Sequence, residues 1–200
     1  MIKRIDVTYS RVAIFLHWTI ALLIIVLLVF GTLMTNPETP NRFVLYQWHK
    51  TGGIMVLLLS VLRLFWRLTH KAPALPSAMK DWEILAAKCS HIGFYVLMIG
   101  MPLLGWAMVS ASPLGFPTKL FGTINWPHMP FLANLEVKEP VAKKLTQAHH
   151  LGGKLMIGLI GLHIGAALKH HFVNKDNVLA RMVPFLRRRE NGIGNSDSRL

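Results

Sequence analysis

The sequence has almost no cysteine, and this shortage excludes several kinds of site. Cys89 is the only cysteine among 200 residues, so neither an intramolecular disulfide nor a cysteine-rich metal site can form. A C-x-x-C-H haem attachment motif is also missing, and any haem would therefore be bound non-covalently. Charged residues make up only 16% of the chain, which is low for a soluble domain.

Apolar residues are abundant, and they place the chain among membrane proteins. They make up 52% of the sequence, and the mean hydropathy is +0.42. The net charge of +13 would suggest nucleic acid in a soluble protein. Here the basic residues flank apolar segments, so membrane topology and anionic lipid explain them better. Nucleic-acid binding is not expected, since no zinc finger or aromatic-basic RNA motif occurs.

Four apolar segments are long enough to span a bilayer, which takes about 20 residues. They run over Val12–Met34, Phe43–Leu68, Ile84–Val109 and Val141–Phe172. The first is too long for the apolar region of a signal peptide, so we expect a retained helix. Backbone groups in lipid must be satisfied within each segment. The sequence therefore predicts an all-α membrane protein: one four-transmembrane-helix up-down bundle over residues 1–186, followed by a disordered polar tail over residues 187–200.

The distribution of lysine and arginine predicts the orientation. Fifteen of the 22 lie before the first segment, between the second and third, or after the fourth, when those at the adjoining ends of the segments are counted too. The other seven lie at the opposite ends of the segments. Because cytoplasmic loops are enriched in positive charge, we expect both termini in the cytoplasm and a multi-pass location in a bacterial inner membrane.

Five histidines lie inside the apolar segments, where ionisable groups are costly and mark candidate functional sites. They are His17, His49, His91, His149 and His163. One isolated histidine would most simply be a polar contact between helices. In an up-down bundle, however, these five fall into two layers. His49 and His149 belong to the outer layer, and the other three share the inner layer, so depth alone leaves the inner pairing open.

The fourth segment is the most informative. His149 and His163 are 14 residues apart, which puts them on nearly one face of a helix and about 21 Å apart along its axis. That spacing suits two porphyrins and excludes a single dinuclear metal site, whose ions lie about 4 Å apart. Two imidazoles on one iron fill both axial positions, as an electron carrier requires. Gly52, Gly152 and Gly153, close to histidines, either make room for such a ring or let helices approach closely.

Several stretches resemble the prokaryotic cytochrome b561 family. They are SRVAIFLHW, YQWHKTGG, HIGFYVLMIGMPLLGW and the final IGLHIGAALKHHFVNKDNVLARM, and together they cover nearly all of residues 9–184. The likeness is strongest to the branch that contains superoxide oxidase, a di-haem enzyme that passes electrons from superoxide to ubiquinone. It implies two haems b, the outer one held by His49 and His149 and the inner one by His17 and His163.

The same resemblance suggests a quinone site on the inner side. It places His91 and His170 there, with Lys80 or Lys88 nearby, since a histidine can donate a hydrogen bond and a proton to a quinone. His170 and His171 could equally be an interfacial pair that reaches towards water, and His150 is a reserve ligand. Lysines 50, 143, 144 and 154 could attract superoxide to the outer side, or they could merely solvate helix ends.

The leading hypothesis is transfer of electrons from a periplasmic donor such as superoxide, through two haems, to ubiquinone of the respiratory chain. An alternative is a haem b subunit that relays electrons for a separate dehydrogenase or hydrogenase-type partner. A different class, a metal or ion transporter, would use the ten histidines and ten methionines, but transmembrane carboxylates are missing. The loop Ser112–Pro140 has no assigned role, although it could cover the outer haem edge.

Overall fold

Four long helices dominate the computed structural model, which describes residues 8–74 and 79–186. The helices are α1 (Arg11–Thr35), α2 (Arg42–Thr69), α3 (Asp81–Ser110) and α5 (Glu139–Lys169). All four are long and apolar enough to cross a membrane, which confirms the predicted all-α class. Their bounds lie within a few residues of the apolar segments. Pro140 was expected before the last helix, but it lies in the first turn of α5, where its missing N–H costs nothing.

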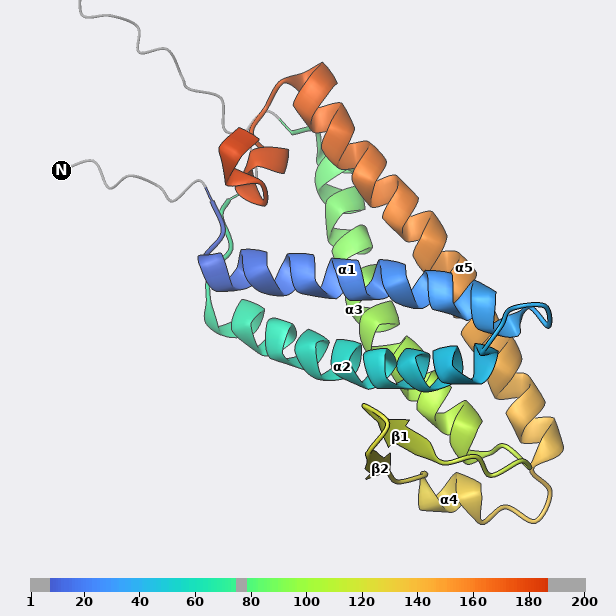
Figure 1. Ribbon diagram of the computed structural model, residues 1–200. Coiled ribbons are helices and arrows are strands. Elements are labelled where there is room, and N and C mark those ends of the chain that lie inside the picture. The colour runs from blue at the N-terminus through green and yellow to red at the C-terminus, as the bar shows by residue number, and fades with distance from the viewer. Residues whose placement is uncertain (1–7, 75–78, 187–200) are drawn as a thin grey trace, which may run out of the picture.

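The helices pack in a chain of neighbours. α1 packs on α2, α2 on α3, and α3 on α5, whereas α5 makes no extensive contact with α1 or α2 in the described ranges. Figure 1 shows α1 lying beside α2, with α5 inclined to both. Two glycines allow the close approaches. A Cβ on Gly52 would lie 2.7 Å from Cδ2 of Leu27 in α1, and one on Gly152 would overlap the sulfur of Met101 in α3. Lipid gives no hydrophobic drive for helix association, so such close packing has to supply it.

The core lies midway along the helices and contains a residue from each of them. Ile20 and Ile24 of α1, Val56 of α2, Met98 of α3 and Met156 of α5 form one buried cluster. In sequence each member falls between the positions of the two predicted histidine layers. The cluster therefore separates these layers with apolar side chains.

A small hairpin occupies one end of the bundle, and we call this end the hairpin side. β1 (Thr118–Leu120) pairs antiparallel with β2 (Ile124–Trp126), and the short α4 (Pro130–Ala133) follows. Phe121 and Gly122 make the turn with φ of 53° and 77°. The backbone N–H of Lys119 donates to Gln47 at 3.1 Å, and that of Phe121 donates to the Thr51 hydroxyl at 3.3 Å. The loop left unassigned from the sequence is thus attached to the start of α2.

The opposite end, the termini side, is closed by the chain after α5. A π-helical turn, η1 (His170–Asn174), leads into two 3₁₀ turns, η2 (Leu179–Arg181) and η3 (Pro184–Leu186). The Met182 carbonyl accepts from Trp18 Nε1 at 2.9 Å, and Arg181 Nη1 donates to the Ala74 carbonyl at 2.6 Å. This segment therefore ties α5 to α1 and to the connection after α2. The polar tail predicted over residues 187–200 lies outside the described residues.

Candidate functional site

Four of the predicted histidines form two matched pairs. His49 of α2 faces His149 of α5 on the hairpin side, and His17 of α1 faces His163 of α5 on the termini side. The ring centroids are 6.2 Å apart in both pairs, and the ring planes are inclined by 72° and 62°. Each pair bridges α5 to a helix that it does not pack against extensively. Both pairs therefore lie where α5 is not packed tightly against α1 or α2.

The separation of 6.2 Å is what two ligands on one metal would show. Imidazole nitrogens bind first-row metals at about 2.0–2.1 Å, and the ring centre lies about 1.1 Å behind the nitrogen, so two rings on opposite sides of one ion have centroids about 6.3 Å apart. A direct hydrogen bond would bring donor and acceptor to about 3 Å, and no such bond joins either pair. The rings are thus spaced for an atom between them.

The second ring nitrogens also suit metal ligands. Nδ1 of His17, His49 and His149 is buried and has no hydrogen-bond partner. The backbone carbonyl of Leu27 interacts with the His49 ring, and that of Met101 interacts with the His149 ring. Neither contact has the geometry of a hydrogen bond. Metal-bound histidines usually direct their other N–H to a backbone carbonyl or carboxylate, which orients the ring. A small adjustment on metal binding would complete both contacts.

Glycines leave space beside the hairpin-side pair. Gly53 and Gly153 each follow a paired histidine by four residues and so share its helix face. A Cβ on either would meet nothing within 4 Å. Gly105 of α3 instead lets the His149 ring approach closely, because a Cβ there would lie 3.2 Å from Cε1 of His149. The glycines thus keep the face of the pair open and let α3 support one ring, as a flat macrocycle requires.

By distance alone, His91 could pair with His163 as well as His17 does. Its ring centroid is 6.4 Å from that of His163, with the planes inclined by 60°. His91 belongs to α3, however, which packs directly on α5, and a Cβ on Gly93 would already lie 3.3 Å from Leu159 of α5. α1 leaves more room. Packing therefore favours His17 for a bulky group between two rings, while His91 stays beside the site.

His170 lies in a polar cluster on the termini side. It is 6% exposed, and its Nδ1 lies 2.6 Å from Asp176 Oδ2 and 3.2 Å from Asn174 Nδ2. Because a carboxylate can only accept, Nδ1 carries the proton and donates to Asp176. Nε2 is left for another partner, and Nε2 has no hydrogen bond to a described residue. Sequence reasoning did not assign a role to Asp176 or Asn174, although Asp176 lies in the KDN segment that follows the HH pair.

A second ion pair borders this cluster. Lys169 Nζ lies 2.5 Å from Glu83 Oε1, and Lys169 also stands over the Trp82 ring at 5.0 Å. Glu83 is 8% exposed, and it interacts electrostatically with His170. The pair joins the start of α3 to the end of α5. No hydrogen bond or ring contact joins His91 to His170 among the described residues.

The predicted outer lysines differ in what they contact. Lys50 Nζ donates to the Pro117 carbonyl at 3.2 Å, so it holds the hairpin rather than standing free. Lys143, Lys144 and Lys154 are exposed on α5. His150 is exposed as well. It lies about 100° round the helix from His149, and its role as a reserve ligand stays a prediction.

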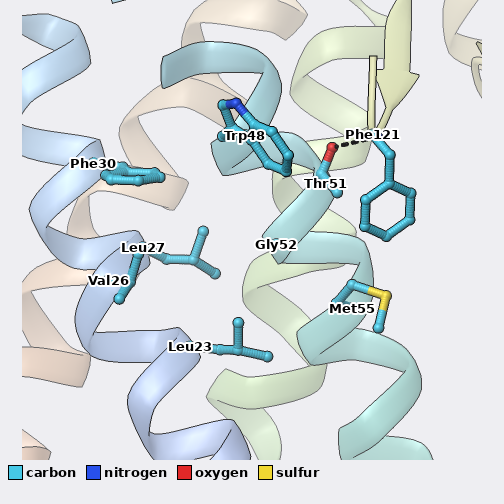
Figure 2. A pocket seen from close by; sticks show the side chains of 9 residues that line it. All are labelled: Leu23, Val26, Leu27, Phe30, Trp48, Thr51, Gly52, Met55 and Phe121. Atoms are coloured by element: carbon cyan, nitrogen blue, oxygen red, sulfur yellow. Dashed lines mark hydrogen bonds between the residues drawn. The ribbon is translucent and has the colours of Figure 1, made fainter. Parts of the chain in front are cut away.

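The apolar groove in Figure 2 has none of the paired histidines in its lining. It lies between α1 and α2 near the hairpin, and the ring of Phe121 lies at its edge. Its volume is about 170 Å³, below the roughly 300–1,000 Å³ typical of small-molecule sites. No titratable side chain lines it. The groove therefore offers no imidazole or acid–base group for redox chemistry.

Fold and site together define a multi-pass membrane protein with paired histidines at two depths. A sequence model of the prokaryotic cytochrome b561 family matches residues 8–185, and the chain belongs to that family. The chain is accordingly an electron carrier of the b561 type that binds b-type haem, as the resemblance in the sequence implied.

Curated relatives agree with this assignment. "Cytochrome b561 homolog 1" of Escherichia coli (strain K12) is 29% identical over 180 residues, which cover 88% of this chain and 97% of the relative. "Probable superoxide oxidase CybB" of Yersinia pestis is 31% identical over 180 residues, which cover 88% and 96%. "Cytochrome b561 homolog 2" of Escherichia coli (strain K12) is 26% identical over 177 residues, which cover 88% and 90%.

Proposed function

We propose that this protein carries electrons across a bacterial inner membrane to ubiquinone, with superoxide as the donor. In this proposal His49 and His149 hold one haem b, and His17 and His163 hold a second. When bound between two imidazoles, haem b supplies reversible one-electron chemistry on an iron with no open position. The observation that supports the proposal most is the pair of equal 6.2 Å separations between imidazole rings at two depths of one bundle.

The chain's own residues suit such a carrier. The four histidines stand on the long helices α1, α2 and α5. The core around Val56, Met98 and Met156 lies between the two pairs and keeps water and polar groups out of that region. Two imidazoles and a dry surrounding would favour electron transfer over oxygen binding in a haem held by these residues.

The donor is proposed on the hairpin side, which we expect to face the periplasm because positive charge is in excess on the opposite side. Lys143, Lys144 and Lys154 are exposed on the helix that contains His149. A cationic surface raises the encounter rate of a small anion. The relative from Yersinia pestis, a probable superoxide oxidase, supports superoxide over a larger partner.

The acceptor is proposed on the termini side, next to His91 and His170. Ubiquinone takes up two electrons and two protons to become ubiquinol. Two superoxide anions supply the electrons, each losing one to become dioxygen, and the protons come from the cytoplasm. When its ring carries a proton on both nitrogens, His170 donates from Nδ1 to Asp176, 2.6 Å away, and can deliver the Nε2 proton to a carbonyl oxygen.

The first test is a haem-to-protein ratio with a reduced-minus-oxidised spectrum of the purified protein. We expect two haems b per chain, and loss of both in the protein with His149→Ala and His163→Ala together. A colourless wild-type protein would refute the proposal. Superoxide-driven ubiquinone reduction in detergent is then the activity test, with His91→Ala as the variant that keeps both haems and loses the activity.

Among the described residues, no group of three or more His, Cys, Asp or Glu has a metal-binding arrangement. The metal transporter alternative therefore gains no support from the structure. Co-purification of a second subunit would favour the relay alternative.

A further inference from the structure

Arg63 on α2 corresponds in position to His163 on α5. His49 and Arg63 are 14 residues apart on α2, as His149 and His163 are on α5. At 100° per residue, both pairs lie on nearly one helix face. Arg63, His17 and His163 are also each six residues from the termini-side end of their helices. Arg63 is therefore at the depth and on the side of the His17–His163 pair.

The interactions of Arg63 agree with this placement. The guanidinium of Arg63 interacts electrostatically with His17, His91 and His163. The phenol groups of Tyr9 and Tyr95 and the guanidinium of Arg67 act on it in turn. The groups that interact with Arg63 are thus imidazoles, phenols and another guanidinium. No carboxylate of a described residue pairs with Arg63.

This arrangement lacks an anion. A guanidinium keeps its charge in proteins, and a half-buried one at membrane depth is costly without a partner. Arg67 follows Arg63 by one turn, and like charges four residues apart destabilise a helix. Both costs would be removed by an anionic group lying between the imidazole pair and α2. Arginine binds carboxylates particularly well, because its two N–H groups match their two oxygens.

We propose that Arg63, assisted by Arg67, binds the propionate groups of the haem held by His17 and His163. Haem b has two propionates, and two guanidiniums one helical turn apart match that charge. This inference rests on the proposed function, because it needs a haem at that pair. The proposal does not extend to the hairpin-side pair, because Lys50 at the start of α2 already donates to the Pro117 carbonyl.

The experiment uses the full-length protein produced with haem whose propionate carboxyl groups carry ¹³C. Redox-difference infrared spectra then identify the propionate bands by their isotope shift. We expect these bands to move in Arg63→Gln and, to a smaller extent, in Arg63→Lys, which keeps the charge but loses the paired N–H groups. The midpoint potential of one haem should also fall in Arg63→Gln, since a nearby positive charge favours the reduced form.

Arg42→Gln is the matched control, because Arg42 is at the other end of α2 and stands over the Phe43 ring. It should leave the labelled bands and both midpoint potentials unchanged. Labelled bands that stay in place in Arg63→Gln with both haems retained would overturn the inference. If Arg63→Gln loses a haem, unchanged bands in Arg63→Lys would do the same. A wild-type protein without haem would instead refute the proposed function itself.

Discussion

The imidazole ring of His17 lies with its centroid 6.2 Å from that of His163, although α1 and α5 do not pack closely. His91 approaches the same ring at 6.4 Å from the packed side. We therefore expect His17→Ala to lose one of two haems and His91→Ala to keep both. Haem-to-protein ratios of the two variants check this directly. One haem in the His91→Ala protein would make His91 the ligand and reverse the assignment.

Space beside His149 gives a second prediction. Gly153 shares a helix face with His149 and has open space around its Cα. Gly153→Leu should fill that space and strongly lower the haem content of the hairpin-side site. Gly158→Leu is the control, because nine residues place it on the opposite face from His149, where it is exposed. The two variants should differ in haem content and not in yield of folded protein. Equal haem content in both would show that no macrocycle lies beside Gly153.

Much of this architecture was predictable because lipid leaves few options. A segment of about 20 apolar residues must be helical in a bilayer, so α1, α2 and α3 begin and end close to the predicted bounds. The rise of about 1.5 Å per residue converts sequence spacing into depth. For this reason the two layers, and the hairpin-side pair of His49 and His149, followed from the sequence.

Rotation and tertiary contacts were less accessible. Depth could not choose between His17 and His91, because the choice depends on which helix packs against α5. The hairpin at 118–126 is too short to give a periodic signal, and it is attached through Gln47 and Thr51 of a distant helix. The contact between Lys50 and Pro117 likewise joins residues far apart in sequence and could not be predicted from it.

The contact between His170 and Asp176 predicts a defect confined to quinone reduction. Asp176→Asn replaces a charged acceptor with a neutral amide, so it weakens control of which ring nitrogen carries the proton. We expect both haems to remain and superoxide to reduce them at the normal rate. Ubiquinone reduction should slow by up to about 100-fold, the lower range for a positioned proton donor. Asn174→Ala is the milder comparison, because its amide lies farther away, at 3.2 Å.

Stopped-flow traces that separate haem reduction from haem reoxidation by a ubiquinone analogue check this prediction. Slow reduction by superoxide in Asp176→Asn would contradict it, since Asp176 is on the termini side. Loss of haem would indicate instead that the turn after α5 supports the fold.

The exposed lysines of α5 predict a salt-dependent donor reaction. Replacing Lys143 and Lys144 together by Gln should lower the second-order rate of haem reduction by superoxide, because the attraction of an anion to this surface is reduced. The wild-type rate should fall as ionic strength rises from 0.01 to 0.15 M, where the screening length shortens from about 30 Å to about 8 Å. The variant should be much less sensitive to salt. Lys88→Gln, on the opposite side of the membrane, should match wild type at every ionic strength. Parallel salt dependence in all three proteins would mean that these lysines only solvate the start of α5, and the donor would then have to be sought among neutral or cationic partners.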